Sequence, residues 1–333
     1  MKTLIAIAFV LSSLVGIAPT PAQAQAPAPA KPPPLEADEF RVTLLGTGSP
    51  APVMRRFGPG VLVQVGGKNL LIDSGRGVTQ RLFQVGLPFG KIDALFLTHL
   101  HSDHVVGIPD LWLTGWLRTS YAGRAGPFVV YGPAGTKELM DGLKQAYAWD
   151  IQARIADQNF DPAAIESRVT EIAEGVVYDR DGVKVSAIEV DHGELLKPAF
   201  GYRIDHGGRS VTISGDTRFS ENLIRHASGT DLLIHQVAAA RDELLKIDSF
   251  KVILAHHTQP EEAGTVFSRV KPALAVYYHF VLLGTPKVPA VNEEEIIQMT
   301  RKTWDGPLLI GEDLMAFRVG KGKVDQLMGA PKK

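Results

Sequence analysis

Apolar positions recur along the chain in two patterns, one typical of strands and one typical of helices. Short β-branched and apolar runs bounded by Gly, Pro and Asn predict strands at 41–50, 60–75, 92–98, 128–133, 183–192, 199–205, 210–216, 231–236, 252–257, 274–280, 306–313 and 315–320. Apolar residues at helical spacing predict helices at 78–87, 105–120, 134–149, 219–227, 259–270 and 292–302. Strands that alternate with helices indicate an α/β protein with sheets inside and helices outside.

The first residues have a different pattern, in which a basic residue, an apolar run and small residues follow one another. Lys2 precedes an apolar run at 4–17, and the run is followed by Ala22-Gln23-Ala24. This layout predicts a signal peptide at 1–24 that is cleaved after Ala24, and therefore a periplasmic or secreted protein. The alternative is an uncleaved membrane anchor, although the apolar run is shorter than a spanning helix.

The rest of the chain divides by composition. Residues 25–39 are rich in Pro and Ala, which predicts a solvated, disordered tether, and a folded domain is expected at 40–320. Within that domain, residues at about 150–175 form an acidic insert that we expect to be helical. Residues 321–333 are interpreted as a C-terminal tail.

Charge and cysteine content narrow the possible functions. Lys and Arg number 35 against 36 Asp and Glu, so no excess of positive charge indicates nucleic acid or an anionic membrane as a partner. We therefore expect no nucleic-acid partner, and no membrane insertion after the signal is removed. The chain has no Cys, so any metal site must use nitrogen and oxygen ligands.

The segment 96–112, "FLTHLHSDHVVGIPDLW", concentrates metal-binding residue types directly after an apolar strand. It places His99, His101, Asp103 and His104 within six positions. His99 and His101, two apart on an extended segment, can bind one divalent metal, and Asp103 with His104 can face a second. The alternative is a set of surface histidines with Asp103 as a helix N-cap.

The segment "THLHSDH" resembles the HxHxDH signature of the metallo-β-lactamase superfamily, and the resemblance covers residues 41–318. The segments "LLGTGSP", "SGDTRFSENLI", "DLLIH" and "AHHTQPEEAG" are similar to the tRNase Z branch of that superfamily. The uninterrupted "HSDHVVGIPDLWLTGW" with a secretion signal is closer to its exported arylsulfatases. The resemblance implies an αββα sandwich with metals at the edge where two sheets meet.

The resemblance also implies the complete ligand set. His99, His101 and His192 hold one metal, Asp103, His104 and His279 hold the other, and Asp216 bridges the two. Zn²⁺, two per chain, is the expected cofactor, with Mn²⁺ or Fe²⁺ as alternatives. Asp73 in "LIDSG" either accepts a hydrogen bond from a ligating imidazole or is a simple turn residue.

The resemblance also implies a role for His257 in proton transfer, because it matches a tRNase Z histidine that lies beside the metals. Asp103 is the other residue that we expect to take part in catalysis. The helix after His257 is expected to begin at Thr258, with Glu261 as the partner in a capping box. Gln236 stands where tRNase Z usually has a Glu, and an amide can orient His257 without stabilising its positive charge. The side chain of the neighbouring His256 is expected to point the other way. The remaining histidines, His206, His226 and His235, are interpreted as structural or surface residues.

Three aromatic residues, Trp112, Trp116 and Tyr121, either line an apolar pocket at the mouth of the site or belong to the core. Two cations, Arg76 and Arg218, either meet an anionic substrate or lie at the surface.

These features together predict an exported dinuclear zinc hydrolase of small anionic esters, an arylsulfatase or phosphodiesterase that uses a metal-bridging hydroxide. A β-lactamase or lactonase, a non-catalytic metal-binding protein and a tRNase Z-type 3′-processing endoribonuclease are the alternatives. The tRNase Z alternative lacks a basic arm for tRNA, because the insert at 150–175 is acidic. The expected partner is a small-molecule ester, with a homo-oligomer possible.

Overall fold

The computed structural model describes residues 33–36 and 38–328. The predicted signal peptide and residues 25–32 of the predicted tether therefore lie outside the described residues. At the end of the tether, the guanidinium of Arg41 donates to the carbonyl oxygens of Pro33 and Pro34, at 2.6 and 3.2 Å. Within the described residues, no helix is both long enough and apolar enough to cross a membrane.

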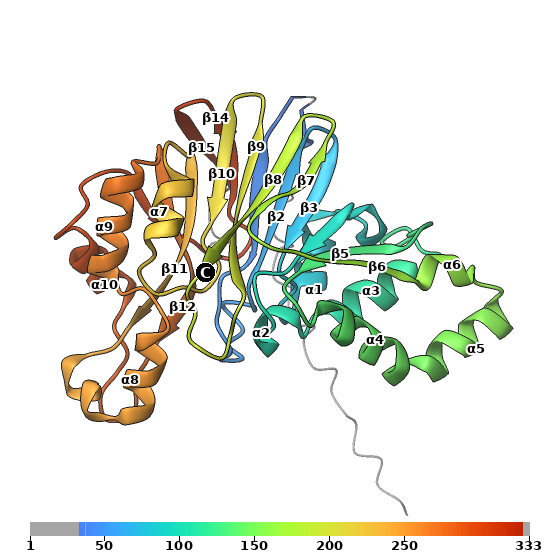
Figure 1. Cartoon of the computed structure of the whole chain (residues 1–333), viewed down its shortest axis with the longest axis horizontal. Coiled ribbons are helices and arrows are strands. Elements are labelled where there is room, and N and C mark those ends of the chain that lie inside the picture. The colour runs from blue at the N-terminus through green and yellow to red at the C-terminus, as the bar shows by residue number, and fades with distance from the viewer. Residues whose placement is uncertain (1–32, 37, 329–333) are drawn as a thin grey trace, which may run out of the picture. The chain divides into compact units, whose positions relative to one another are not determined.

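Two mixed sheets pack face to face in the middle of the domain (Figure 1). The eight-stranded sheet has, in spatial order, β15 (Lys323–Met328), β14 (Ala316–Gly320), β1 (Arg41–Gly46), β2 (Gly60–Val65), β3 (Lys68–Ile72), β4 (Ala94–Phe96), β5 (Phe128–Gly132) and β6 (Ser167–Glu171). The seven-stranded sheet has β13 (Leu308–Ile310), β12 (Leu274–Leu282), β11 (Leu232–Ala239), β10 (Arg209–Ile213), β9 (Ala199–His206), β8 (Val183–Val190) and β7 (Gly175–Arg180).

Helices cover the outer face of each sheet. Those on the eight-stranded sheet are α1 (Val78–Val85), η1 (Phe89–Lys91), α2 (Ser102–Val105), α3 (Ile108–Trp116), α4 (Thr136–Ala146), α5 (Ala148–Gln158) and α6 (Pro162–Ile165). Those on the side of the seven-stranded sheet are α7 (Glu221–Ala227), η2 (Asp242–Lys246), α8 (Asp248–Ala255), α9 (Pro260–Val270) and α10 (Glu293–Thr300). The predicted αββα sandwich is confirmed.

Strand alternation explains why both faces of a sheet are buried. In β2, Val61 and Val63 join the core between the two sheets, whereas Leu62 packs with the helices on the outer face. Successive side chains of a strand point to opposite faces, so an almost continuous apolar run supplies both layers. The core between the sheets is closed from the other side by residues such as Val185 and Ile213.

Each sheet combines antiparallel and parallel strands. From β3 to β6 the neighbours are parallel, as they are from β10 through β11 and β12 to β13. Parallel strands present their carboxyl ends at the same edge of a sheet, which is where α/β proteins commonly bind ligands. Asp73 follows β3, His99 follows β4 and Asp216 follows β10, so the fold brings these residues to one edge.

The prediction of a strand at 252–257 is wrong, because residues 248–255 form α8. Phe250, Ile253 and Leu254 have the i, i+3, i+4 spacing of a helix face, and Asp248 lies in the first turn. A short apolar run alone does not distinguish a strand from a buried helix.

Two further segments differ from their predicted structure. The insert at 150–175 is helical only through α5 and α6, after which residues 167–171 form β6 and pair with β5. Residues 323–328 of the predicted tail form β15 and pair with β14. In both cases a partner strand distant in sequence determines the structure.

Candidate metal centre

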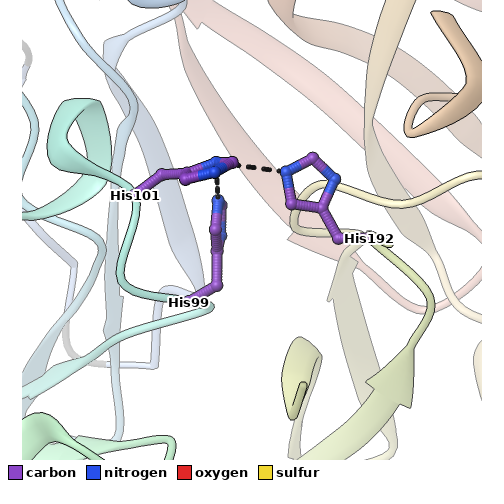
Figure 2. A group of neighbouring side chains, drawn as sticks. All are labelled: His99, His101 and His192. Atoms are coloured by element: carbon purple, nitrogen blue, oxygen red, sulfur yellow. Dashed lines mark hydrogen bonds between the residues drawn. The ribbon is translucent and has the colours of Figure 1, made fainter. Parts of the chain in front are cut away.

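The histidine motif forms a turn between β4 and α2. The apolar strand β4 ends at Phe96, His101 occupies the N-cap position of α2, and the amide of His104 donates to the carbonyl of His101 at 3.0 Å. This turn directs His99 and His101 toward His192, which follows β8. Nδ1 of His101 lies 3.1 Å from Nε2 of His99 and 3.2 Å from Nε2 of His192 (Figure 2).

A second group lies next to the first. Nε2 of His279 is 3.2 Å from Nε2 of His104 and 3.2 Å from Oδ2 of Asp103. His279 is an extra residue in β12, where the pairing with β11 shifts, and it has a φ of 44°. A bulge of this kind re-aims a side chain, which explains how a residue inside a strand reaches the site.

Asp216 lies between the two groups. Its Oδ2 atom is 3.4 Å from Nε2 of both His104 and His279, 3.8 Å from that of His192, and 4.0 Å from that of His99. The preceding Gly215 has a φ of 61°, and a Cβ there would lie 2.4 Å from the carbonyl oxygen of Phe200. Only glycine fits this turn, so the turn fixes the position of Asp216.

The predicted ligands therefore converge, and their geometry fits a pair of divalent metals. Nitrogens bound to one tetrahedral zinc lie about 3.3 Å apart, from Zn–N bonds of about 2.0 Å, and the observed separations of 3.1–3.2 Å are close to this. Oδ1 of Asp216 and Nδ1 of His279 are buried without a hydrogen-bond partner. Unpartnered buried polar atoms are costly, and at Asp216 a metal ion would supply a partner for the free oxygen.

The protonation states of His99, His192 and Asp216 suit metal binding. Burial lowers the pKa of His99 well below its usual range and that of His192 to about 4, so both imidazoles are neutral at neutral pH. Burial raises the pKa of Asp216, but the neighbouring His279 and His104 outweigh burial and hold it well below the usual range. Asp216 is therefore an ionised carboxylate in a protein interior, and a buried charge of this kind is normally paired or coordinates a metal.

Contacts behind the ligands fix their orientation. Oδ2 of Asp73 lies 2.8 Å from Nδ1 of His104, and the amide of Thr98 donates to Oδ1 of Asp73 at 2.8 Å. Nδ1 of His192 donates to the main-chain carbonyl of His256 at 2.9 Å, which leaves Nε2 free for a metal. Asp73 was open to two interpretations, a turn residue or the hydrogen-bond partner of a ligating imidazole. Its contact with His104 favours the second. The roles of Thr98 and of the His256 carbonyl were not found from sequence, since main-chain contacts leave no residue signature.

His257 reaches the same cluster from the end of α8. Its Nδ1 lies 2.7 Å from the carbonyl oxygen of Ile253, and its Nε2 lies 3.5 Å from Oδ2 of Asp216. Burial lowers the pKa of His257, but the hydrogen bond and charge of Asp216 outweigh it, and the pKa is raised. The orienting partner is therefore Ile253 rather than Gln236, whose amide nitrogen donates to the carbonyl of Thr217 at 2.7 Å.

The predicted capping box is displaced by one residue. Helix α9 has Gln259 as its N-cap, and the amide of Gln259 donates to Oε2 of Glu262 at 2.9 Å. The hydroxyl of Thr258 instead donates to the carbonyl of Thr217 at 2.8 Å.

The three aromatic residues do not line the site. Trp112 and Trp116 are buried, and their indole nitrogens donate to the carbonyls of Ile165 and Asp161. Tyr121 packs against Phe83 and Phe89 at a separate cavity. These aromatic residues belong to the helical side of the eight-stranded sheet, so the structure supports the core alternative for both tryptophans.

The other candidate residues also lie outside the ligand cluster. Nη1 of Arg76 donates to the carbonyl of Pro50 at 3.4 Å, and Arg218 pairs with Asp191 at 3.5 Å. The remaining histidines contact other groups: His206 the Gly182 carbonyl, His226 the Glu174 carboxylate and His235 the Gln236 carbonyl.

A cavity of about 360 Å³ opens onto the cluster. Its polar lining includes His101, Asp103, His192, Asp216, His256, His257 and His279. Its other lining residues are Ser49, Pro50, Ala51, Val252, Ile253, Val281, Leu282 and Leu283. His256 thus also lines the cavity, with its ring centroid 6.0 Å from that of His192. The apolar lining was not predicted, because its residues come from α8, the end of β12 and a loop that meet only in the folded chain.

The chain is similar in sequence to a known protein family and to several named proteins. The family described as Anti-Pycsar protein Apyc1 matches residues 40–245, more than half of the 333-residue chain. A protein named Ribonuclease Z from Mycolicibacterium gilvum is 37% identical over 287 residues, which cover 85% of this chain and 97% of that protein.

Solved structures share the fold. The metallo-β-lactamase fold protein YhfI from Bacillus subtilis aligns with a TM-score of 0.64 at 18% identity, over 84% of this chain and 99% of that one. The short form of human tRNase Z aligns with a TM-score of 0.60 at 23% identity, over 83% of this chain and 98% of that one.

The ribonuclease Z relatives overturn the hypothesis of an arylsulfatase or small-ester phosphodiesterase. They also overturn the expectation of a small-molecule partner and no nucleic acid. The charge argument failed because net charge sums the whole surface, whereas a phosphodiester is bound by local groups, and the acidic insert does not line the cavity.

The relatives and the fold instead agree with the tRNase Z-like resemblance of the motifs. The chain belongs to the ribonuclease Z-like metallo-β-lactamase family, whose members are metal-dependent hydrolases.

Proposed function

We propose that the chain is an endoribonuclease of the ribonuclease Z type, which hydrolyses one phosphodiester bond near the 3′ end of precursor tRNA. The observation that carries this proposal is that histidine and aspartate side chains from both halves of the chain, His257 among them, converge around Asp216. The names of the ribonuclease Z relatives support the choice of RNA as substrate.

Two divalent metals complete the proposed site. One would be held by His99, His101 and His192, the other by Asp103, His104 and His279, with Asp216 shared. A set rich in imidazole favours zinc, with manganese or iron as alternatives. When bound, the metals supply Lewis acidity at the phosphate oxygens and lower the pKa of the attacking water.

The chain's own residues then place the proton. The attacking water loses one proton to the solvent as its oxygen bonds to phosphorus, the bond from phosphorus to the departing ribose oxygen breaks, and the departing oxygen takes up a proton. The carbonyl of Ile253 holds Nδ1 of His257, so Nε2 faces the cavity and can deliver the proton. The raised pKa of His257 favours the protonated imidazole that this role requires.

The test is cleavage of a precursor tRNA with a 3′ trailer by purified, zinc-loaded protein. We expect one cut at the junction with the trailer, no cut in mature tRNA, and no cut after the metal is removed by a chelator. Intact precursor in the presence of zinc, manganese and iron would exclude the proposal.

We further propose export, on the basis of the signal-like residues 1–24. Intact-mass measurement of the protein from its native cells should give a chain that begins at Gln25. A mass that includes Met1 and the following residues would contradict cleavage of a signal peptide after Ala24.

A further inference from the structure

The cavity has one side that the proposed hydrolysis does not explain. We define the apolar wall as Val252 and Ile253 of α8 with Val281, Leu282 and Leu283 at the end of β12. These residues line the same cavity as Asp216 and His257. The apolar wall therefore lies within the same cavity as the proposed reacting groups.

The apolar wall is firmly attached to the fold. Leu254 packs with Ala238 and Val281 in a buried cluster, and Ile253 and Leu283 pack against that cluster. The carbonyl of Ile253 holds His257, so the apolar wall begins one contact away from the proposed proton donor. Val252 is 56% exposed and is free to contact a ligand.

The chemistry of the cavity limits what can bind there. None of its lining residues is Lys or Arg, so the lining has no permanently charged side chain to pair with a second phosphate. The aliphatic side chains of the apolar wall offer no hydrogen bond to ribose hydroxyls. The faces of the bases are the large apolar surfaces of RNA, and they pack on apolar side chains in other nucleic-acid sites.

We propose that the base of one nucleotide joined to the scissile phosphate packs against the apolar wall. This inference rests on the proposed function. The contact uses the face of the base and does not read its edge, because the aliphatic side chains carry no donor or acceptor. The site thus recognises the presence of a base at this position and tolerates all four bases.

The experiment uses zinc-loaded full-length protein and precursor tRNA with an abasic residue placed in turn on each side of the cut. One of the two abasic RNAs should lose on the order of 10-fold in kcat/KM, as expected for loss of the apolar contact with the face of a base. The four natural bases at that position should differ by only a few fold. Equal cleavage of both abasic RNAs and the intact RNA would overturn the inference while leaving the proposed function intact.

A variant connects this effect to the apolar wall. Val252→Ser should lose on the order of 3- to 10-fold in kcat/KM on intact RNA and nothing on the sensitive abasic RNA. The matched control is Val176→Ser on β7, a valine that is 59% exposed and does not line the cavity. An equal loss of Val252→Ser on both RNAs would contradict a contact with the base. Failure to cut any precursor would overturn the proposed function and this inference together.

Discussion

The two sides of the cavity are built in different ways. On the ligand side the groups are buried, with His99 1% and Asp216 2% exposed, and partners such as Asp73 fix their direction. On the apolar wall, Val281 is buried whereas Val252 is 56% exposed, and the side chains rest on a small cluster. Metal coordination is directional and requires fixed atoms, whereas apolar contact is not directional. We therefore expect steep losses on the ligand side and graded losses on the apolar wall.

The largest effect is expected at the residue shared by both metal groups. Asp216→Ala should lower kcat/KM for precursor tRNA by on the order of 10⁴ or more, because the variant lacks the central carboxylate. Elemental analysis should show metal content falling from two to one or none per chain. Asp205→Ala, which removes a carboxylate paired with Arg203 on β9, is the control and should retain both metals. Full metal content in Asp216→Ala would contradict a bridging role.

The next effect tests the connection between the two sides at His257. His257→Ala should slow RNA cleavage by on the order of 10² to 10⁴, because a ribose oxygen departs poorly without a proton. A nitrophenyl phosphodiester should be affected far less, since nitrophenolate departs as an anion. Rates for both substrates in wild type, His257→Ala and the neighbouring His256→Ala give the measurement. Equal losses on both substrates in His257→Ala would exclude proton donation to the departing oxygen.

A smaller effect is expected one contact behind the ligands. Asp73→Asn should lower the affinity for one of the two metals by about 10- to 100-fold, because the amide cannot stabilise His104 as a carboxylate does. Asn is suited to this position, since Asp73 has a φ of 59° and Asn tolerates that region. Competition with a zinc chelator measures the affinity, and Asp93→Asn, outside the cluster, is the control. Unchanged affinity of both metals would show that Asp73 is only a turn residue.

The smallest effect on activity is expected in the helical layer outside the cavity. Trp112→Phe should leave kcat/KM for precursor tRNA unchanged while it lowers the free energy of unfolding by about 1–3 kcal/mol. The cause is the loss of the hydrogen bond from its indole nitrogen to the carbonyl of Ile165. Thermal unfolding and a kinetic assay of the same preparation test both parts. A large fall in kcat/KM at unchanged stability would mean that Trp112 contacts the substrate.

The sequence predicted the ligand side far better than the apolar wall. His99, His101, Asp103 and His104 lie within six positions, so their chemistry can be read locally, and the resemblance added the distant ligands. The structure shows how a bulge at His279 brings such a distant residue to the cluster.

The apolar wall has no local signature. The apolar run at Val252 and Ile253 predicts a strand, and the position of both residues beside Leu283 depends on the packing of α8 against β11 and β12. The orienting carbonyls of Ile253 and His256 are likewise invisible in sequence, because every residue has a carbonyl. The net charge of the chain led to the wrong expectation of no nucleic-acid partner for a related reason, because net charge does not reveal which groups line the cavity.

The most direct test of the account is a zinc titration of chelator-treated protein with precursor tRNA cleavage as the readout. Two metal groups that share Asp216 predict that cleavage at the 3′ junction returns fully at about two zinc ions per chain. Elemental analysis of the restored protein should give the same number. Full cleavage without metal, full activity at one zinc ion per chain, or no cleavage at any zinc concentration would contradict a two-metal ribonuclease.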